Sequence, residues 1–422
     1  MPIRKSWIEA ANNPEGNFPL NNLPYGIFLD ENGTGHPCVA IGDQVLDIGL
    51  LEAEGVIAVA DGPVFDVPFI NRFMEKGPAA WAALRARLTS LLAEGGSDGL
   101  RGNVPLRQAA LMPMATVRMG MPFVVAEYTD FYAGRNHARN VGTMLRGPEN
   151  ALPPNWLHIP IGYNGRASTV VVSGTGIHRP NGQLKGPADT VPRFGPCKQL
   201  DIELEMGAVV GTANTMGQPV SVAEADEMIF GYVILNDWSA RDIQAWEYQP
   251  LGPFQAKVFA STISPWVVTG AALNPFRTAT PEREKELLPY LHEPGPMLYD
   301  INLEVGLAPE GGAESIISRT NYDRMYYSSA QQLAHHASGG CRMRVGDLLG
   351  SGTISGPGVN ERGTLLEITW AGKHPITLED GQTRTFLEDG DTVTLRGQAR
   401  GDGYRIGFGT CAGKILPAVR YP

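Results

Sequence analysis

Glycine and proline constrain the fold of this chain more than any other feature of its sequence. They supply 51 and 33 of its 422 residues, which exceeds average usage. Both residues favour turns and weaken the interior of a helix, so this usage predicts many turns between short strands rather than a helical bundle. We therefore expect a mainly β fold with some helices, and a chain of this length is sufficient for two domains.

Charge and hydropathy exclude two classes of partner. The 34 Lys and Arg residues against 44 Asp and Glu residues give a formal net charge of −10, opposite in sign to the basic surface of a nucleic-acid-binding protein. Hydrophobic residues make up 43% of the chain. No stretch, however, approaches the roughly 20 apolar residues that a membrane-spanning helix needs. We expect neither a nucleic acid nor a membrane as a partner.

The cysteines and the N-terminus bear on the cellular compartment. Cys38, Cys197, Cys341 and Cys411 are far apart and form no C-x-x-C pair, so they predict neither a zinc ribbon nor a redox dithiol. The first residues, MPIRKSWIEAANN, lack the apolar run and the cleavage site of a secretory signal. We expect reduced thiols and a cytoplasmic location.

The sequence predicts a small β module at the N-terminus, followed by a larger domain. One helix is expected after Pro78 and before Gly95, because apolar residues recur there at three- and four-residue spacing. These residues are Trp81, Leu84, Leu88, Leu91 and Leu92. The polar segment 95–103 is the candidate linker, with a boundary between about 95 and 120. We assign residues 1–120 to the first domain and 121–422 to the second.

The strongest chemical signal is the segment DIELEM at residues 201–206. Its strict alternation predicts a β-strand with Asp201, Glu203 and Glu205 on one face and apolar side chains on the other. Neighbouring like charges repel unless solvent or a cation relieves them. A solvated outer face is the ordinary interpretation, but this face is entirely carboxylate. Such oxygen ligands suit Mg²⁺ or Ca²⁺.

A helix and a buried strand are expected next. The capping box of Ser221 and Glu224 predicts a short helix that Gly231 ends. The apolar run 232–235 then predicts a buried strand, which places Asp237 at its carboxyl end.

A row of polar side chains follows on a further predicted helix, with Ser239 as its N-cap. Arg241, Gln244 and Tyr248 are spaced by three and four residues, so they point the same way. This row is either an exposed, salt-bridged face or part of a site.

Asp130 is another possible oxygen ligand for a cation.

Two further residues suggest acid–base chemistry. His137 can change protonation near neutral pH, although a lone histidine is more often structural. Glu367 lies in the apolar run 365–368, interpreted as a strand. Pairing of Glu367 with His137 would give a base able to take a proton from water.

Several enzyme classes are disfavoured by missing motifs. The sequence contains no G-x-x-x-x-G-K-[ST] loop, no G-x-G-x-x-G after a strand, no H-E-x-x-H and no G-x-S-x-G. These absences lower the odds of an NTPase, a dehydrogenase, a zinc protease and an α/β-hydrolase.

Stretches along nearly the whole chain resemble the fumarylacetoacetate hydrolase superfamily. They include NLPYGIF, YTDFY, LRGPENALPPNWLHIPIGYNGRAS, LDIELEM, LNDWSARDIQAWEYQPLGPF, TISPWV, GDLLGSGTISG, LLEITW and DGYRIGFGTCAGKILPA, in that order. The resemblance implies an N-terminal SH3-like barrel, a larger C-terminal β-roll that holds the site, and a homodimer. It implies hydrolytic carbon–carbon bond cleavage of 4-fumarylacetoacetate to fumarate and acetoacetate, the last step of tyrosine and phenylalanine catabolism.

The resemblance also implies a role for each matching residue. The divalent ion, Mg²⁺ or Ca²⁺, would be held by Asp130, Glu203, Glu205 and Asp237, with Lys257 and Ser261 near a second, structural Mg²⁺ position. The catalytic residues would be His137, Glu367, Arg241, Gln244 and Lys257. The substrate contacts would be Tyr132, Arg146, Tyr163, Gln244, Tyr248 and Thr353.

One departure from the family pattern is expected to matter. Ala260 stands where the family has glycine, and it would be strained if the backbone there has a positive φ. Two other functions stay open: hydrolysis or decarboxylation of a related diketo acid, such as an acylpyruvate or fumarylpyruvate, and a metal-binding or scaffold protein without activity.

Overall fold

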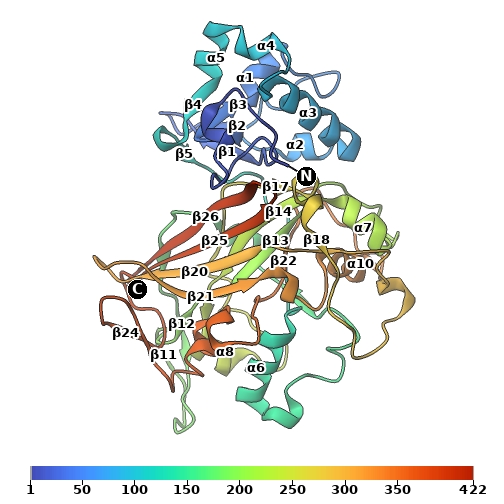
Figure 1. Ribbon diagram of the computed structural model, residues 1–422. Coiled ribbons are helices and arrows are strands. Elements are labelled where there is room, and N and C mark those ends of the chain that lie inside the picture. Colours follow the sequence, from blue (N-terminus) through green and yellow to red (C-terminus); the bar gives the residue numbers. More distant parts are fainter. Residues whose placement is uncertain (1, 422) are drawn as a thin grey trace.

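The computed structural model describes residues 2–421, and it places a small N-terminal domain on top of a larger β domain (Figure 1). The N-terminal domain contains a five-stranded antiparallel sheet in the order β4-β3-β2-β1-β5, which matches the expected SH3-like barrel. Its strands are β1 (Tyr25–Leu29), β2 (Gly35–Ile41), β3 (Gln44–Asp47), β4 (Leu111–Pro113) and β5 (Arg118–Met119). Its helices are α1 (Ile48–Ala53), α2 (Asn71–Met74), α3 (Gly77–Leu92), α4 (Asp98–Arg101) and α5 (Val104–Ala110).

The helix expected after Pro78 is confirmed as α3, which buries Leu84, Leu88 and Leu91. The linker expected at 95–103 is wrong, because this segment contains α4 and leads directly into α5. The amide of Asn103 begins α5 by accepting a hydrogen bond from the N–H of Leu106. A run of Gly, Ser and Asp therefore marks short helices and their caps here rather than a domain boundary.

The larger domain is built on two sheets. The first has eight strands in the order β7-β6-β22-β13-β14-β16-β8, with β17 paired to β14. Its strands are β6 (Tyr128–Phe131), β7 (Gly162–Asn164), β8 (Val170–Val172), β13 (Leu204–Val210), β14 (Ile229–Asp237), β16 (Ser261–Ile263), β17 (Val268–Thr269) and β22 (Leu348–Gly350). The second sheet has the order β21-β20-β25-β26-β9. Its strands are β9 (Ile177–His178), β20 (Asn302–Ala308), β21 (Ser315–Asn321), β25 (Thr392–Gly401) and β26 (Tyr404–Leu416).

The main core lies between these two sheets, as the expected β-roll requires. Ile234 of β14, Leu303 of β20 and Phe408 of β26 meet around Gly397, where an added Cβ would lie 3.1–3.4 Å from their side chains. This close approach fixes a glycine in the middle of β25.

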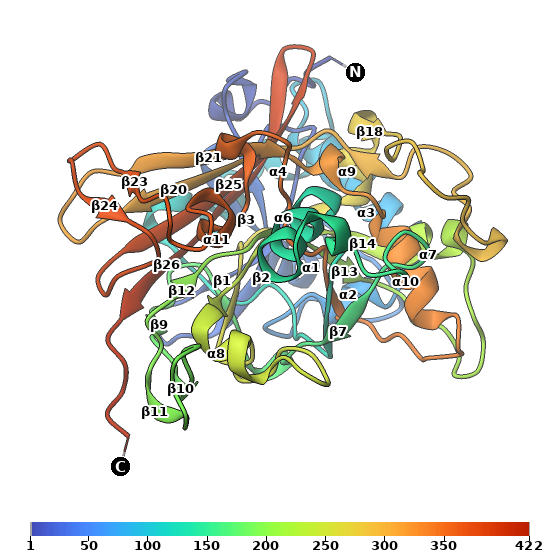
Figure 2. The same cartoon turned by 90° about the horizontal axis from the view of Figure 1, so that it is seen from below.

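Short ribbons and helices complete this domain. The ribbons pair β10 (Asn181–Leu184) with β11 (Arg193–Pro196), β12 (Leu200–Asp201) with β15 (Ser239–Ala240), β18 (Arg277–Thr278) with β19 (Leu298–Tyr299), and β23 (Ile376–Thr377) with β24 (Thr383–Arg384). The helices are α6 (Arg135–Arg146), α7 (Val222–Met228), α8 (Arg241–Glu247), α9 (Gly270–Leu273), α10 (Ser329–Ala337) and α11 (Leu365–Ile368). Seen from below, α6, α8 and α11 lie on the face opposite the N-terminal domain (Figure 2).

The capping box at Ser221 and Glu224 is confirmed at the start of α7, but the expected helix end at Gly231 is wrong. The helix stops at Met228, and Gly231 lies within β14. A Cβ at Gly231 would lie 2.4 Å from the carbonyl oxygen of Val268. The glycine therefore allows β17 to approach rather than ending a helix.

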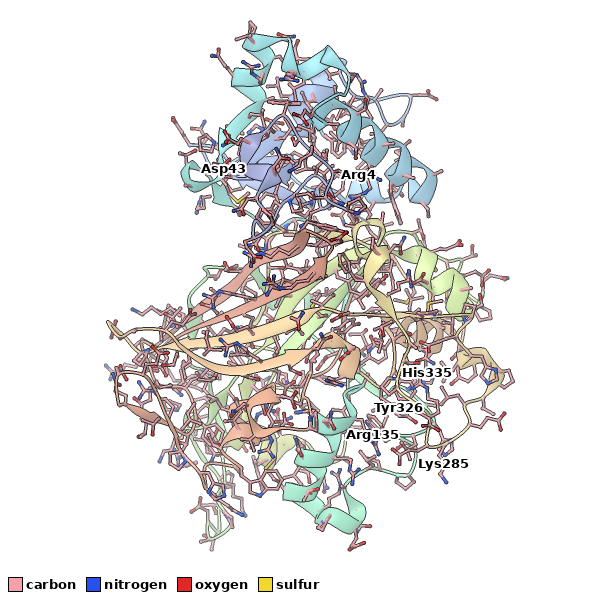
Figure 3. All side chains as sticks on the ribbon, in the orientation of Figure 1. Arg4, Asp43, Arg135, Lys285, Tyr326 and His335 are labelled. Carbon is pink, nitrogen blue, oxygen red and sulfur yellow. The ribbon has the colours of Figure 1, made fainter. Side chains whose placement is uncertain are left out.

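The two domains share backbone hydrogen bonds. Tyr25 of β1 and Val267 exchange both of theirs, at 3.0 and 2.8 Å. The ring of Trp266 packs beneath Gly26, where an added Cβ would lie 2.7 Å from it. Arg4 and Asp43 mark the N-terminal domain in Figure 3, and Arg135, Tyr326 and His335 mark the larger one. No helix among residues 2–421 is long and apolar enough to cross a membrane.

Candidate active site

Four buried carboxylates gather in the large sheet. Asp130 lies on β6, Glu205 on β13 and Asp237 at the end of β14, while Glu203 immediately precedes β13. One oxygen of each lies within 4.8 Å of the others. The sequence-predicted cation ligands are thus brought together, although Asp130 is more than 70 positions from the others.

A glycine makes room for this cluster. β22 runs between β6 and β13, and a Cβ on its Gly350 would lie 2.9 Å from both Asp130 Oδ1 and Glu205 Oε2. Any side chain at this position would occupy the space between the carboxylates. Gly350 of the motif GDLLGSG therefore leaves space for the carboxylates because it has no side chain.

The acidic segment differs from the single alternating strand expected for it. The strand pairing is interrupted at Ile202 and Glu203, between β12 and β13, and both faces of the segment are buried. Asp201 consequently does not join the cluster. Its carboxylate lies 2.8 Å from Nε of Arg241 instead.

Two cations lie against the cluster. The ammonium of Lys257 lies 2.8 Å from Glu203 Oε1 and 2.6 Å from Asp237 Oδ2. Nη1 of Arg241 donates to Glu203 Oε1 at 2.7 Å, and the hydroxyl of Ser261 donates to Asp237 Oδ1 at 2.9 Å. As an ammonium, Lys257 has no lone pair for a metal, so here it acts as a donor.

Burial and charge set the pKa values of the cluster. Burial and the neighbouring carboxylates raise the pKa values of Asp130 and Glu205 well above their usual range. Burial also acts on Glu203, but the charges of Lys257 and Arg241 outweigh it and lower its pKa. Burial would lower the pKa of Lys257, but the charges of Asp237 and Glu203 outweigh it and raise that pKa. Asp130 and Glu205 are therefore the carboxylates whose ionisation is most disfavoured unless a cation lies beside them.

The donor set fits a hard divalent cation. Oδ1 of Asp130 and Oε1 of Glu205 are buried, and neither finds a hydrogen-bond partner within the described part of the chain. Four carboxylates face two cations, one of which is also bonded to Asp201. A buried oxygen site with uncompensated negative charge is the environment that Mg²⁺ and Ca²⁺ occupy in proteins.

His137 and Glu367 form a buried pair beside the cluster. Nδ1 of His137, on α6, lies 2.7 Å from Oε2 of Glu367. An ionised carboxylate only accepts hydrogen bonds, so Nδ1 carries the donated proton, and in the neutral form of the imidazole Nε2 is then an acceptor. The strand expected at residues 365–368 is wrong: these residues form the short helix α11.

The carboxylate of Glu367 accepts several hydrogen bonds from protein side chains. Besides His137, it accepts hydrogen bonds from Asn140, Ser355 and Thr364 at 2.8–3.0 Å. Burial alone would raise the pKa of Glu367, but the charge of His137 and these hydrogen bonds lower it below its usual value. Glu367 is thus held ionised next to the imidazole.

The helix that carries Arg241 begins differently from the prediction. Ala240 is the N-cap of α8, with no side-chain capping bond. Ser239, expected as the cap, lies on β15, and its hydroxyl donates to Glu203 Oε1 at 3.1 Å. Asp242 accepts from the backbone N–H of Lys198 at 2.7 Å. The cap residue is therefore used to hold the acidic cluster.

Three of the residues expected to contact substrate lie against the cluster or the pair. Tyr163 donates to Asp237 Oδ2 at 3.3 Å, and Gln244 accepts from Nη1 of Arg241 at 3.1 Å. The Tyr132 ring meets the His137 ring edge-on, with 5.4 Å between centroids.

The other three lie further out or lack a partner. The hydroxyl of Thr353 is buried and has no partner in the described chain. Arg146 ends α6 and donates to the carbonyls of Asn150 and Ala151. Tyr248 follows α8 and accepts from Gln249 at 3.2 Å.

Sequence reasoning missed Tyr128. Its hydroxyl is buried and unpartnered among residues 2–421, and it lies 3.1 Å from the Cβ position of Gly350, beside the oxygens of Asp130 and Glu205. Two-residue spacing from Asp130 on β6 places both side chains on one face. That spacing was the available signal.

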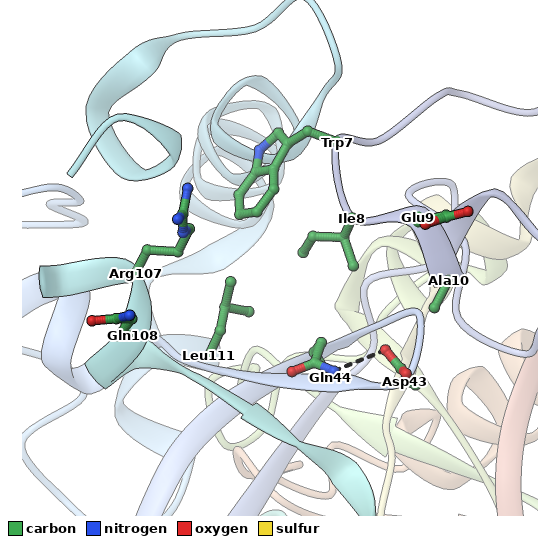
Figure 4. Close-up of a pocket in the computed structure, with 9 residues that line it drawn as sticks. All are labelled: Trp7, Ile8, Glu9, Ala10, Asp43, Gln44, Arg107, Gln108 and Leu111. Carbon is green, nitrogen blue, oxygen red and sulfur yellow. Dashed lines mark hydrogen bonds between the residues drawn. The ribbon is translucent and has the colours of Figure 1, made fainter. Parts of the chain in front are cut away.

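A pocket lies on the N-terminal domain, away from these residues (Figure 4). It has a volume of about 620 Å³ and none of the sequence-predicted site residues lines it. Its lining residues are Trp7, Ile8, Glu9, Ala10, Asp43, Gln44, Arg107, Gln108 and Leu111.

Fold and site together define a two-domain β protein with a cluster of four buried carboxylates, which suits a divalent cation, and an adjoining His–Glu pair. Residues 21–122 match the family model described as Fumarylacetoacetase N-terminal, and residues 127–416 match Fumarylacetoacetate (FAA) hydrolase C-terminal. The chain therefore belongs to the fumarylacetoacetate hydrolase family.

Similar proteins cover almost the whole chain. It is 49% identical over 423 residues to a fumarylacetoacetase of Arabidopsis thaliana, covering 99% of this chain and 100% of that protein. It is 50% identical over 419 residues to a fumarylacetoacetase of Homo sapiens, covering 98% and 99%. Among solved structures, fumarylacetoacetate hydrolase from Exiguobacterium antarcticum has a TM-score of 0.52 at 15% identity, covering 94% of this chain and 99% of that one. This last likeness concerns the fold alone.

Proposed function

We propose that this chain is a fumarylacetoacetase, which uses water to cleave 4-fumarylacetoacetate into fumarate and acetoacetate. The observation that carries this function is the likeness of about 50% to fumarylacetoacetases over nearly the full length of both chains. The gathered carboxylates and the His–Glu pair support it, because they supply the two kinds of group that the reaction needs. The reaction is the last step of tyrosine and phenylalanine catabolism.

The cation, Mg²⁺ or Ca²⁺, would be held by Asp130, Glu203, Glu205 and Asp237. When bound, it can accept two oxygens of a β-diketone and polarise the carbonyl that water attacks. Lys257 and Ser261 hold the carboxylate of Asp237 in position by contacts to its Oδ2 and Oδ1. A second Mg²⁺ near these two residues is part of the same proposal.

His137 is proposed as the base. Since Glu367 accepts a hydrogen bond from Nδ1 of the neutral imidazole, Nε2 of His137 is free to take a proton from water. The water oxygen then forms a bond to the carbonyl carbon on the fumaryl side. The carbon–carbon bond breaks, its electron pair leaves with the acetoacetate part as an enolate, and a proton from the histidine can complete the product.

Three donors are proposed to stabilise the leaving group. Arg241, Gln244 and Lys257 surround the edge of the acidic cluster, and Nη2 of Arg241 is buried without a partner in residues 2–421. A buried, unused donor costs free energy unless a ligand accepts from it, which supports a role against developing negative charge. The substrate contacts are proposed to be Tyr132, Arg146, Tyr163, Gln244, Tyr248 and Thr353.

The test is a turnover assay that follows the ultraviolet absorbance of fumarylacetoacetate. Protein stripped with a chelator is expected to be inactive, and Mg²⁺ or Ca²⁺ is expected to restore it. Activity that survives the chelator would argue against the cation's role. No turnover under any condition would reject the function, and acylpyruvate and fumarylpyruvate assayed in parallel would then identify a related diketo-acid hydrolase or decarboxylase.

We further propose a cytoplasmic homodimer with a domain boundary near residue 120. The β10–β11 ribbon and α8 pack together through a hydrogen bond from Trp246 to Gln183, and apolar side chains around them face solvent. Leu251 is 93% exposed, and Phe194 and Phe254 are also exposed. Light scattering is expected to give twice the chain mass, and a monomer would reject this assembly.

A further inference from the structure

One buried carboxylate outside the cation cluster joins two parts of the candidate site. Asp201 is fully buried on β12. Its two oxygens accept hydrogen bonds from Nε of Arg241 and from the backbone N–H groups of Ile202, Leu365 and Leu366, at distances of 2.7–3.0 Å. A buried carboxylate with this many donors is fully hydrogen-bonded. The donors therefore fix the position of Asp201, and Asp201 in turn fixes the positions of the donors.

Two carboxylates fix the guanidinium of Arg241. Its Nε donates to Asp201 at 2.8 Å, and its Nη1 donates to Glu203 at 2.7 Å. These two bonds hold the planar group at two different nitrogens, which sets its orientation. The remaining nitrogen, Nη2, is the buried donor that has no partner in the described chain.

The contacts with Leu365 and Leu366 begin α11. The first N–H groups of a helix have no partner within it, and a helix of four residues has little else to stabilise it. Asp201 accepts from the first two of these groups, and the hydroxyl of Thr364 accepts from the third, that of Glu367. The same Thr364 hydroxyl donates to the Glu367 carboxylate. Asp201 therefore helps to place Glu367 opposite His137.

We propose that Asp201 is a positioning residue that keeps Arg241 and the Glu367–His137 pair in fixed positions relative to each other. This rests on the proposed function for its kinetic consequences. The contacts themselves do not depend on it, so structural and kinetic measurements can be separated.

The first test is Asp201→Asn, which keeps the size of the side chain but presents an amide N–H₂ to a donor. We expect kcat to fall about tenfold to a hundredfold, because displaced groups lose effective positioning. We expect KM to stay within about threefold and the dissociation constant of Mg²⁺, measured by titration calorimetry, to be unchanged within the same factor, because Asp201 is not a cluster ligand. Hydrogen exchange at Leu365 and Leu366 should become faster.

The matched control is Asp391→Asn. Asp391 is equally buried and accepts from Arg384 and from the N–H of Glu388, but it contacts none of the candidate site residues. We expect a comparable loss of thermal stability with unchanged kcat. An equal loss of kcat in both variants would reduce Asp201 to a general structural residue and overturn the proposal, as would Asp201→Asn with wild-type kcat.

A measurement on the unmodified protein covers the case in which Asp201→Asn does not fold. The amides of Leu365 and Leu366 and the Nε–H of Arg241 should exchange slowly with solvent. Rapid exchange would overturn the proposal without any variant. Wild-type protein that fails to turn over fumarylacetoacetate, but shows slow exchange at these groups, would instead reject the proposed function alone.

Discussion

His137 and Glu367 show how many groups are needed to hold one proton acceptor. Glu367 is completely buried, and four side-chain donors, including His137 itself, converge on its two oxygens. These donors replace the water that a free carboxylate would have. Because Glu367 accepts the hydrogen bond from Nδ1 of His137, the orientation of the imidazole depends on the residues that hold Glu367 in place.

We expect His137→Ala to lower kcat by about 10² to 10⁴-fold while the affinity for Mg²⁺ is unchanged, since the side chain is the proposed base and not a proposed ligand. The measurements are turnover and titration calorimetry on the same preparation. His335→Ala is the control, because His335 lies on α10 and contacts Tyr290, which is not among the candidate site residues. Retained turnover in His137→Ala would remove the residue from the mechanism.

Ala260 gives a prediction of no effect. It is buried, but it is not among the non-glycine residues with positive φ, which are Leu23, Trp370 and Ala371 in the described chain. The strain considered from the sequence is therefore absent. Ala260→Gly should leave kcat within about twofold and lower the free energy of unfolding by about 0.5–1 kcal/mol, through backbone entropy. A large gain in activity would show that the alanine strains this loop.

At the scale of single elements, local pattern and long-range contacts gave different results. The strand β14 and its terminal Asp237 follow from the apolar run 232–235, because a strand buried on both faces needs only apolar residues. The four residues of α11 read equally well as a strand, since short apolar runs are ambiguous. Their helical form depends on Asp201, more than 160 positions away. No local pattern contains that information.

The break between β12 and β13 has the same origin. Alternation predicted one strand, and the residues Glu203 and Glu205 do reach the cluster as expected. Asp201 lies against Arg241 and α11 instead of joining the cluster. Its carboxylate accepts hydrogen bonds there, whereas beside Glu203 and Glu205 it would be repelled by two other carboxylates. The resemblance to known proteins supplied the ligand set, whereas alternation alone would have included Asp201 in it.

The helix α11 predicts a pH dependence of stability. The pKa of Glu367 in the folded protein is lowered from its usual value of 4.5. Its stabilising contribution is therefore present above pH 4.5 and is lost as the pH falls through the folded-state pKa. We expect the difference in unfolding free energy between the wild type and Glu367→Gln, measured with urea, to be largest at neutral pH and to shrink below about pH 4.5. A difference independent of pH would contradict this account.

At the scale of the whole molecule, the site is assembled from strands and helices that are distant in the sequence. Composition predicted the β class, length and segment pattern predicted two domains, and the resemblance supplied the barrel and the roll. Neither could show that Gly350 leaves space between Asp130 and Glu205, because that requires the order of strands in the sheet. The register of the large sheet is thus what converts scattered acids into one cluster.

We expect the proposed cation to contribute to the global stability of this assembly. Four carboxylates held within 4.8 Å repel one another, and a bound ion relieves that repulsion only in the folded chain. Chelation should lower the melting temperature, and ion at about 100 times its dissociation constant should restore about 2.7 kcal/mol. In Glu205→Gln the ion should have a much smaller effect. A melting temperature indifferent to chelator in the wild type would contradict the proposed site.

The strand β26 contacts residues that lie far before it in the sequence. The N–H of Gly407 donates to the carbonyl of Asn17, the carbonyl of Gly407 accepts from the side chain of Asn22, and Cys411 donates to the carbonyl of Thr262, next to Ser261. These partners are synthesised long before β26 leaves the ribosome. Nascent chain that lacks β26 leaves β25 with an open edge, which is a template for aggregation. Closure of the roll therefore has to follow the synthesis of β26.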